Sequence, residues 1–508
     1  MHELKELINI ALGWRSEHAN TIKYITGSKK SLSNTLISDI YNGKINTDAE
    51  AQRALYGNNK NIVACKKLKE RLRERLLTNI LFTHASTRSQ KTYAYNVFFC
   101  HKYYVIAMLF IKISHSATGV KLMQRVLNRA QKFQVTPVVV LAASILRKKC
   151  VERGDKKAFD EYSALMKHYH ALIQAEDEAD QLHDRLMIQF AHSYAPKPEL
   201  IPLAAEAVAY IGKQKNAFGT YNLHLLYFLV SNLHAQLTGN YALALAVCNA
   251  FEEYFLARPE FYSKGRHANI TIVKTDSLLC MGAYRQGLQQ AEKNLVLFES
   301  MEGNRPIVLE LQFVMALRVS DFTLAANCYK ELMALAGSKN IYAHKIEMWQ
   351  LLGGYLWLCL VAKDNNKLKS ETFGESSNIF LQEILQRITI YKKDKQGVNI
   401  SLAFLQFALL VQQKDYISAI NKTEQLKTYM YKYISRRFGA REYIFLKLML
   451  LLHKHNFDVI KAEKKAVLLL KKLETTPIVA FAFNNTRVEI LEYKQLWQLV
   501  VDQLRMND

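Results

Sequence analysis

The sequence predicts an all-α protein, in which a small helical module precedes a right-handed superhelical solenoid of antiparallel helix pairs. Three observations favour this fold class. The chain has 508 residues and a hydrophobic content of 50%, which suits a large packed core. It contains only 7 prolines and 19 glycines, fewer than a turn-rich β-protein needs. A turn-and-helix pattern also recurs about every forty residues in the second half, as in helical-repeat proteins.

Residues 1–88 are expected to form the N-terminal helical module. An apolar stripe that includes Leu4 and Ile8 predicts a first helix, and further helices are expected over about 33–41 and 61–82. Between them, Thr47 and Glu50 have the spacing of a capping box, in which two side chains each accept a hydrogen bond from the other residue's backbone N–H. This box predicts a short helix that ends near Gly57.

Residues 43–76 carry a specific order of turn and helix residues. It reads Gly43-Lys44-x-x-Thr47-x-x-Glu50-x-x-x-x-Leu55-Tyr56-Gly57, followed by Ala64, Leu68, Leu72 and Leu76. The order resembles the helical core of a winged helix-turn-helix domain, and most closely that of the antibiotic-regulatory-type transcriptional activators. In that family a helical domain of tetratricopeptide type follows the DNA-binding domain. The resemblance implies a recognition helix that carries Lys66, Lys67, Lys69 and Arg71; a three-helix structural module is the alternative.

Basic residues are concentrated in the first third of the chain. Residues 1–157 hold 28 basic and 10 acidic side chains, whereas residues 158–508 hold 40 and 35. Residues 75–151 contain twelve Lys or Arg and no Asp or Glu. Such asymmetry suggests a polyanionic partner, which could be nucleic acid, an anionic membrane or an acidic protein. A solvated surface with no specific partner is the alternative.

Two groups of cations stand out within this basic third. Lys121, Arg125, Arg129 and Lys132 are spaced to share one face of a helix over about 119–133, which we expect to face outward. Arg147, Lys148 and Lys149 end the next helix, where they also complement the helix dipole. We assign residues 89–195 to helical pairs that open the array. The aromatic residues that crowd its first helix are expected to be core rather than a base-stacking surface.

Residues 196–508 contain an internal repeat. Its landmarks are Gly239-Asn240-Tyr241, Gly282-Ala283-Tyr284, Ser320-Asp321-Phe322, Lys414-Asp415-Tyr416 and His455-Asn456-Phe457. Each aromatic residue is expected at a turn between two apolar helices. Three positions further on come Ala244, Gly287, Ala325, Ala419 and Ile460. One unit between residues 342 and 393 lacks the landmark, and there the polar stretch 364–377 is expected to replace a tight turn.

The aromatic-x-x-small order resembles degenerate tetratricopeptide repeats. In that motif the small residue lets the two helices approach closely, and the aromatic residue fills the gap between units. The resemblance implies a curved array of helix pairs with a groove that binds proteins or peptides. A final helix over about 488–504 is expected to cap the array.

Signatures of enzymes and of metal or cofactor sites are absent from the sequence. It contains no glycine-rich phosphate loop, no His-Glu-x-x-His, no paired cysteine ligands and no Gly-x-Ser-x-Gly. We therefore expect no enzyme activity, no metal and no cofactor. The seven scattered cysteines suggest buried free thiols in a reducing compartment. No apolar run reaches about 18 residues, so we expect a cytoplasmic protein without membrane insertion, and buried helices at 103–111 and 351–362.

Two functions remain after these exclusions. The first is a non-catalytic helical-repeat scaffold or adaptor that binds a protein or peptide in its groove, with a basic N-terminal third that contacts a polyanion. The second is a nucleic-acid-binding regulator, in which the N-terminal module binds DNA and the repeats sense or recruit a partner. The sequence does not identify the partner or the oligomeric state.

Overall fold

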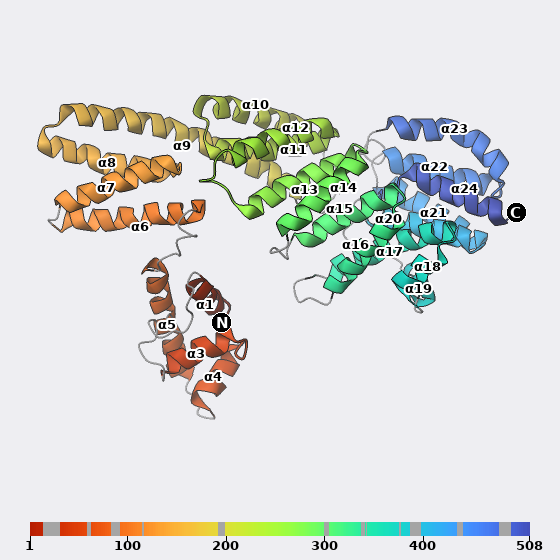
Figure 1. The fold of residues 1–508 in the computed structure, drawn as a ribbon, viewed down its shortest axis with the longest axis horizontal. Helices are drawn as coiled ribbons and strands as arrows, with labels where there is room; N and C mark the ends of the chain where they lie inside the picture. The colour runs from red at the N-terminus through yellow and green to blue at the C-terminus, as the bar shows by residue number, and fades with distance from the viewer. Residues whose placement is uncertain are drawn as a thin grey trace. The chain divides into compact units, whose positions relative to one another are not determined.

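The protein is an all-α helical-repeat solenoid, as the sequence predicts (Figure 1). The computed structural model describes residues 1–13, 31–57, 62–82, 92–113, 116–191, 199–298, 304–336, 341, 343–374, 377–386, 398–433, 440–476 and 489–507. These residues form 23 helices and no strand. They divide into two compact units, one of residues 1–173 with 259–262 and the other of 174–258 with 263–508.

The N-terminal module consists of α1 (His2–Gly13), α3 (Leu32–Tyr41), α4 (Asp48–Tyr56) and α5 (Ile62–Phe82). Its core holds Ile8, Leu36 and Leu72, all fully buried. The predicted capping box is confirmed, because the Glu50 carboxylate accepts from the Thr47 backbone N–H at 3.1 Å and the Thr47 hydroxyl accepts from the Glu50 backbone N–H at 3.2 Å. Sequence spacing therefore located three of these helices closely. The strands and wing of a winged helix domain remain untested, since residues 14–30 and 83–91 lie outside the described part.

Helices α6 (Tyr93–Lys112), α7 (Ser116–Lys132) and α8 (Thr136–Arg153) pack together, and the long α9 (Lys156–Ala191) follows them. Helices α6 and α7 are antiparallel, because Arg129 bonds to Asn96 while Gly119 lies against Ile111. Gly119 is required by that approach, since a Cβ there would lie 2.5 Å from the Ile111 side chain. Three large apolar residues between these helices, Met123, Val126 and Leu127, are buried.

Helix α6 is less buried than the sequence suggested. Within the predicted buried run 103–111, Val105 and Leu109 are 56% and 53% exposed, so that prediction is wrong. Helix α6 is also long and apolar enough to cross a membrane by length and composition alone, a test that core helices of soluble proteins also pass. The second predicted run is confirmed: from Leu351 to Leu360 every residue of α17 is buried.

The second unit is a chain of short helices in which neighbours in sequence pack together (Figure 1). Its helices are α10 (Leu200–Phe218), α11 (Tyr221–Thr238), α12 (Tyr241–Leu256), α13 (Lys264–Cys280), α14 (Tyr284–Phe298), α15 (Arg305–Arg318), α16 (Phe322–Leu335), α17 (Ala343–Ala362), α18 (Asn366–Phe373), α19 (Ser377–Gln386), α20 (Val398–Gln412), α21 (Tyr416–Tyr433), α22 (Ala440–Lys454), α23 (Val459–Thr475) and α24 (Tyr493–Asn507). Helices α13, α15, α17 and α20 also pack on one another in turn. We call the surface formed by these first members of successive pairs the first-helix face.

One turn recurs between the helices of most pairs. A residue with positive φ ends the first helix, its N–H and the next N–H donate back to that helix, and the second helix begins two residues later. The residues with positive φ at these turns are Gly239, Gly282, Ser320, Asp364 and Lys414. The next residue is Asn or Asp in four of the five, and its side chain caps the following helix.

This turn explains where the repeat prediction succeeded and where it failed. Four landmark aromatic residues are the first residues of α12, α14, α16 and α21, as expected. Asp364 makes the same turn before α18, so the expectation that residues 364–377 replace a tight turn is wrong. At the last landmark Asp458 is the N-cap, and the buried residue one turn later is Ala462; Ile460 is 68% exposed.

The compact units divide within α9 at residue 173, whereas the sequence-based boundary at residues 195–196 falls outside the described part. The second half of α9 carries an acidic cluster whose members bond to α10 and α11. Glu178 accepts from the Tyr210 hydroxyl at 2.6 Å, and Glu176 accepts from Thr220 at 2.8 Å. These carboxylates therefore join helices of the second unit. The predicted burial of the cysteines is confirmed for six of the seven, and all seven are free thiols.

Candidate functional site

The cations predicted on the recognition helix lie on α5. Lys66, Lys67 and Arg71 are exposed there. Lys69 instead pairs with Asp48 of α4 at 2.9 Å, and its hydrogen bond lowers the pKa of that carboxyl. Three of the four cations are thus free to meet an anion, while the fourth joins two helices of the module.

The α7 stripe is split between surface and interior. Lys121, Arg125 and Lys132 are exposed, as predicted. Arg129 is not part of the outward face: its Nε donates to Asn96 Oδ1 at 2.6 Å, and its guanidinium lies 3.8 Å from the centre of the Phe99 ring. The prediction for Arg129 fails because a planar guanidinium can both hydrogen-bond and stack on an aromatic ring at a half-buried position.

The three cations near the end of α8 are also used differently from one another. The guanidinium of Arg147 lies 5.8 Å from the Phe159 ring, and Lys149 pairs with Glu152 at 2.7 Å. Lys148 is exposed. The eleven predicted residues are therefore spread over α5, α7 and α8, and they do not converge on one pocket.

The strongest charge chemistry in the described part of the chain lies instead in the second unit, around residues 489–493. Arg318 at the end of α15 is 5% exposed, and its guanidinium donates to the backbone carbonyls of Glu489 and Ile490. Arg441 of α22 donates to both carboxylate oxygens of Glu489, each at 2.7 Å. The Tyr284 hydroxyl donates to Glu492. The non-helical segment that leads into α24 is thus bound by its main chain and its carboxylates.

Helix α24 follows this segment and lies against α17, α20, α22 and α23. Six large side chains of α24 are at most 3% exposed; they are Tyr493, Leu496, Trp497, Val500, Val501 and Leu504. At about 1.5–3 kcal/mol for each buried side chain, their burial stabilises the docked helix by on the order of 10 kcal/mol. The predicted capping helix therefore occupies the C-terminal part of the first-helix face rather than only closing its end.

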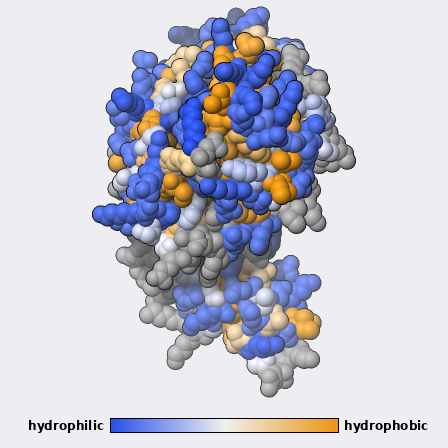
Figure 2. Space-filling model, turned by 90° about the vertical axis from the view of Figure 1, so that its right-hand side faces the viewer, coloured by the Kyte–Doolittle hydropathy of each residue, from blue (hydrophilic) through white to orange (hydrophobic). Residues whose placement is uncertain are grey.

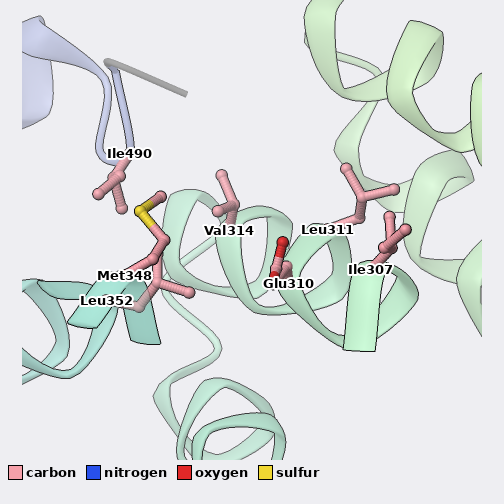
Figure 3. A pocket seen from close by; sticks show the side chains of 7 residues that line it. All are labelled: Ile307, Glu310, Leu311, Val314, Met348, Leu352 and Ile490. Carbon is pink, nitrogen blue, oxygen red and sulfur yellow. The ribbon is translucent and has the colours of Figure 1, made fainter. Parts of the chain in front are cut away.

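A small pocket remains beside the bound segment (Figure 3). It is lined by Ile307, Glu310, Leu311 and Val314 of α15, Met348 and Leu352 of α17, and Ile490. Glu310 is its only charged lining residue and is already paired, with Lys345 Nζ at 3.0 Å and Trp349 Nε1 at 2.7 Å. The pocket therefore presents an apolar surface beside a neutralised carboxylate.

One buried carboxyl near the bound segment has a strongly shifted pKa. Burial raises the pKa of Glu442 to about 7, and the neighbouring Glu489 carboxylate adds to the shift. The Tyr493 hydroxyl donates to Glu442 at 3.3 Å. In the second unit burial also lowers the pKa of His224 to about 4, with the nearby Lys215 and Arg258 contributing.

The residues that bind segment 489–493 were missed by sequence reasoning. Arg318 and Glu489 are 171 positions apart, and no spacing rule connects such residues. A single arginine at the end of a helix also looks like an ordinary C-terminal cation. Within the described part of the chain, no group of three or more His, Cys, Asp or Glu is arranged to hold a metal ion.

Fold and site together define a helical-repeat protein with a segment of its own chain bound on the repeat surface. No protein-family model matches the sequence, and no curated protein shows significant similarity to it.

Proposed function

We propose that this protein is a non-catalytic scaffold or adaptor of tetratricopeptide-like type, which binds an extended segment of a protein partner on its first-helix face. One observation carries the proposal: Arg318 and Arg441 already hold a non-helical segment there through backbone carbonyls and a carboxylate. Backbone carbonyls are common to every peptide, so the same kind of surface suits a segment from another protein.

Helix α13 forms the part of the first-helix face that α24 does not contact, whereas α15 is buried from Val308 to Arg318 and reaches the surface only at Arg305 and Ile307. Helix α24 fills the part formed by α17 and α20. The free energy that its burial contributes exceeds the binding free energy of a typical micromolar peptide, which is about 8 kcal/mol, so such a peptide would not displace it. The pocket beside Ile490 lies where the filled part meets the free part. A partner segment would lie against α13 and the Ile307 end of α15, with a small aliphatic side chain at the mouth of this pocket.

A peptide selection tests the proposal directly. Random peptides displayed on phage are selected on the full-length protein, and the affinities of the selected peptides are measured by calorimetry. We expect Val314→Leu, which adds a methylene group at the pocket, to weaken binding about ten-fold, because one methylene in a tight apolar site changes affinity by this order. The matched control is Val296→Leu on the exposed side of α14, where Val296 is 67% exposed.

The proposal fails if no peptides are enriched, or if the selected peptides bind both variants and the wild-type protein equally. Unfolding temperatures of the two variants, compared with that of the wild-type protein, separate a blocked pocket from a damaged fold.

Nucleic-acid binding is the second candidate, because six predicted cations are exposed on α5 and α7: Lys66, Lys67, Arg71, Lys121, Arg125 and Lys132. Fluorescence anisotropy with DNA and RNA duplexes at increasing salt tests it. We expect Lys121→Gln with Arg125→Gln to reduce the salt slope by about two, one for each phosphate contact. A larger effect of Lys66→Gln with Lys67→Gln would favour the helix-turn-helix resemblance. Absence of binding at low salt would exclude this function.

A further inference from the structure

Helix α23 (Val459–Thr475) presents an apolar stripe to solvent. One side of the helix is packed in the core through Val459, Ala462, Ala466 and Leu473. On the opposite side Ile460, Val467 and Leu468 are 68%, 61% and 78% exposed. These positions follow the i, i+7, i+8 spacing of a single helix face. Large apolar side chains grouped in this way usually mark an interaction surface.

Lysines surround this stripe. Lys464 and Lys471 lie on the same face at i+4 and i+11, and Lys465 and Lys472 lie along its edge. All four are exposed, and none forms an ion pair with a described residue. Figure 2 shows hydrophobic residues reaching the surface among hydrophilic ones on the side of the molecule that includes the C-terminal helices.

The acidic residues of α23 pair mainly with α24, although Lys471 also helps to lower the pKa of the Glu474 carboxyl. Glu463 pairs with Arg505 at 2.7 Å, and Glu474 pairs with Lys494 at 2.5 Å, both cations coming from α24. The free charge of the outer face is therefore positive, and it lies within a side chain's length of the exposed aliphatic residues.

This combination of groups selects among partners. A second copy of α23 would bring lysines against lysines, which disfavours self-association. The phosphates of a nucleic acid would use the lysines but leave three aliphatic side chains in water. An anionic membrane surface uses both, because aliphatic side chains enter the boundary between headgroups and acyl chains while lysines meet the lipid phosphates.

We propose that the outer face of α23 docks this protein onto an anionic phospholipid membrane surface, with the helix axis parallel to the membrane plane. Ile460, Val467 and Leu468 enter the interface, and Lys464, Lys465, Lys471 and Lys472 contact the headgroups. The binding is peripheral and reversible, because three side chains bury far less apolar surface than a spanning helix does. This surface is separate from the peptide site on α15, so either proposal stands or fails without the other.

Co-sedimentation of the full-length protein with vesicles tests this inference. One set of vesicles contains only phosphatidylcholine, and a second contains about one third phosphatidylserine. We expect binding to the second set alone, weakened by salt. Lys464→Gln with Lys471→Gln should lower the partition coefficient about ten-fold or more, since each lysine near an anionic leaflet contributes about five-fold. Val467→Ser with Leu468→Ser should cause a similar loss.

The matched control is Lys121→Gln with Arg125→Gln, which removes the same charge from α7 and should leave vesicle binding unchanged. The inference is overturned by equal binding to both vesicle types or by none. It is also overturned if the control lowers binding as much as the α23 lysine variant, or if the Val467 and Leu468 changes have no effect, since binding would then be purely electrostatic. All changed residues are exposed, and unchanged unfolding temperatures verify that the variants are folded.

Discussion

Cations serve opposite purposes in α7 and around segment 489–493. On α7, Lys121 and Arg125 extend into solvent, and they are two of the twelve cations in the carboxylate-free stretch 75–151. In the second unit, Arg318 is buried and Arg441 is mostly covered, and both donate to backbone carbonyls or to the Glu489 carboxylate, in a part of the sequence with nearly balanced charge. The density of charge along a sequence thus locates exposed surface, whereas the cations that matter most for the fold are single residues in unremarkable surroundings.

The largest change in the free energy of unfolding is expected when Arg441 is replaced. Replacing it by Met keeps the bulk of the side chain but leaves the Glu489 carboxylate buried without its bidentate partner. We expect Arg441→Met to lower the free energy of unfolding by about 3–5 kcal/mol, measured by urea denaturation. A loss below about 1 kcal/mol would mean that Arg441 contributes no more to stability than the exposed cations of α7, and the difference between the two regions would not hold.

The next effect is a pH dependence at Glu442. Because the folded protein holds this carboxyl proton with a pKa of about 7, above its value in the unfolded chain, the folded state binds more protons than the unfolded state between about pH 4.5 and pH 7. Raising the pH through that range therefore removes stability. We expect Glu442→Gln to be more stable than wild type at pH 8, by about 1–3 kcal/mol. Urea denaturation at pH 5, where the difference should shrink, is the matched measurement.

Arg129 belongs to the α7 stripe but is turned inward, so we expect its contribution to stability to lie between those of the exposed α7 cations and of Arg441. Arg129→Met removes the hydrogen bond to Asn96 and the stacking on Phe99. We expect a loss of about 1–2 kcal/mol, compared with less than about 0.5 kcal/mol for Arg125→Met one turn earlier. Equal losses in thermal or urea unfolding would place Arg129 on the outer face after all.

The smallest change in the free energy of unfolding is expected for the exposed cations of α7. Lys121 and Arg125 are one helical turn apart, and like charges at that spacing repel by roughly 0.2–0.5 kcal/mol. Lys121→Gln should therefore raise the free energy of unfolding slightly at low salt, and the gain should vanish as salt screens the repulsion. A loss of stability would show that Lys121 takes part in packing.

The fold could be predicted because its determinants are local. The turns before α12, α16 and α21 are each determined by three consecutive residues: one with positive φ, an Asn or Asp that caps the next helix, and an aromatic residue that begins it. The turn at Asp364 escaped notice because Asn366 replaces the aromatic residue while the backbone conformation is kept. The exposed outer faces of α6 and α23 also escaped notice, since an apolar helix looks the same in sequence whether or not a neighbour covers it.

The bound segment could not be predicted because it depends on contacts between distant residues. Nothing near Arg318 indicates that residue 490 will return to it, and Glu489 lies at the edge of a described segment with no repeat landmark. Sequence periodicity describes how neighbouring helices stack, and it carries no information about which later segment will cross them.

That return of the chain has a consequence for unfolding. In an open solenoid each pair contacts only its neighbours, so the terminal pairs can fray one at a time. Here α24 bonds to the end of α15 through Gln495 and packs on α17, α20 and α22, so the last pairs cannot separate without releasing it. Amide hydrogen exchange in α20, α22 and α24 should therefore report one shared opening reaction, whereas amides in α10 and α11 should exchange through openings of their own.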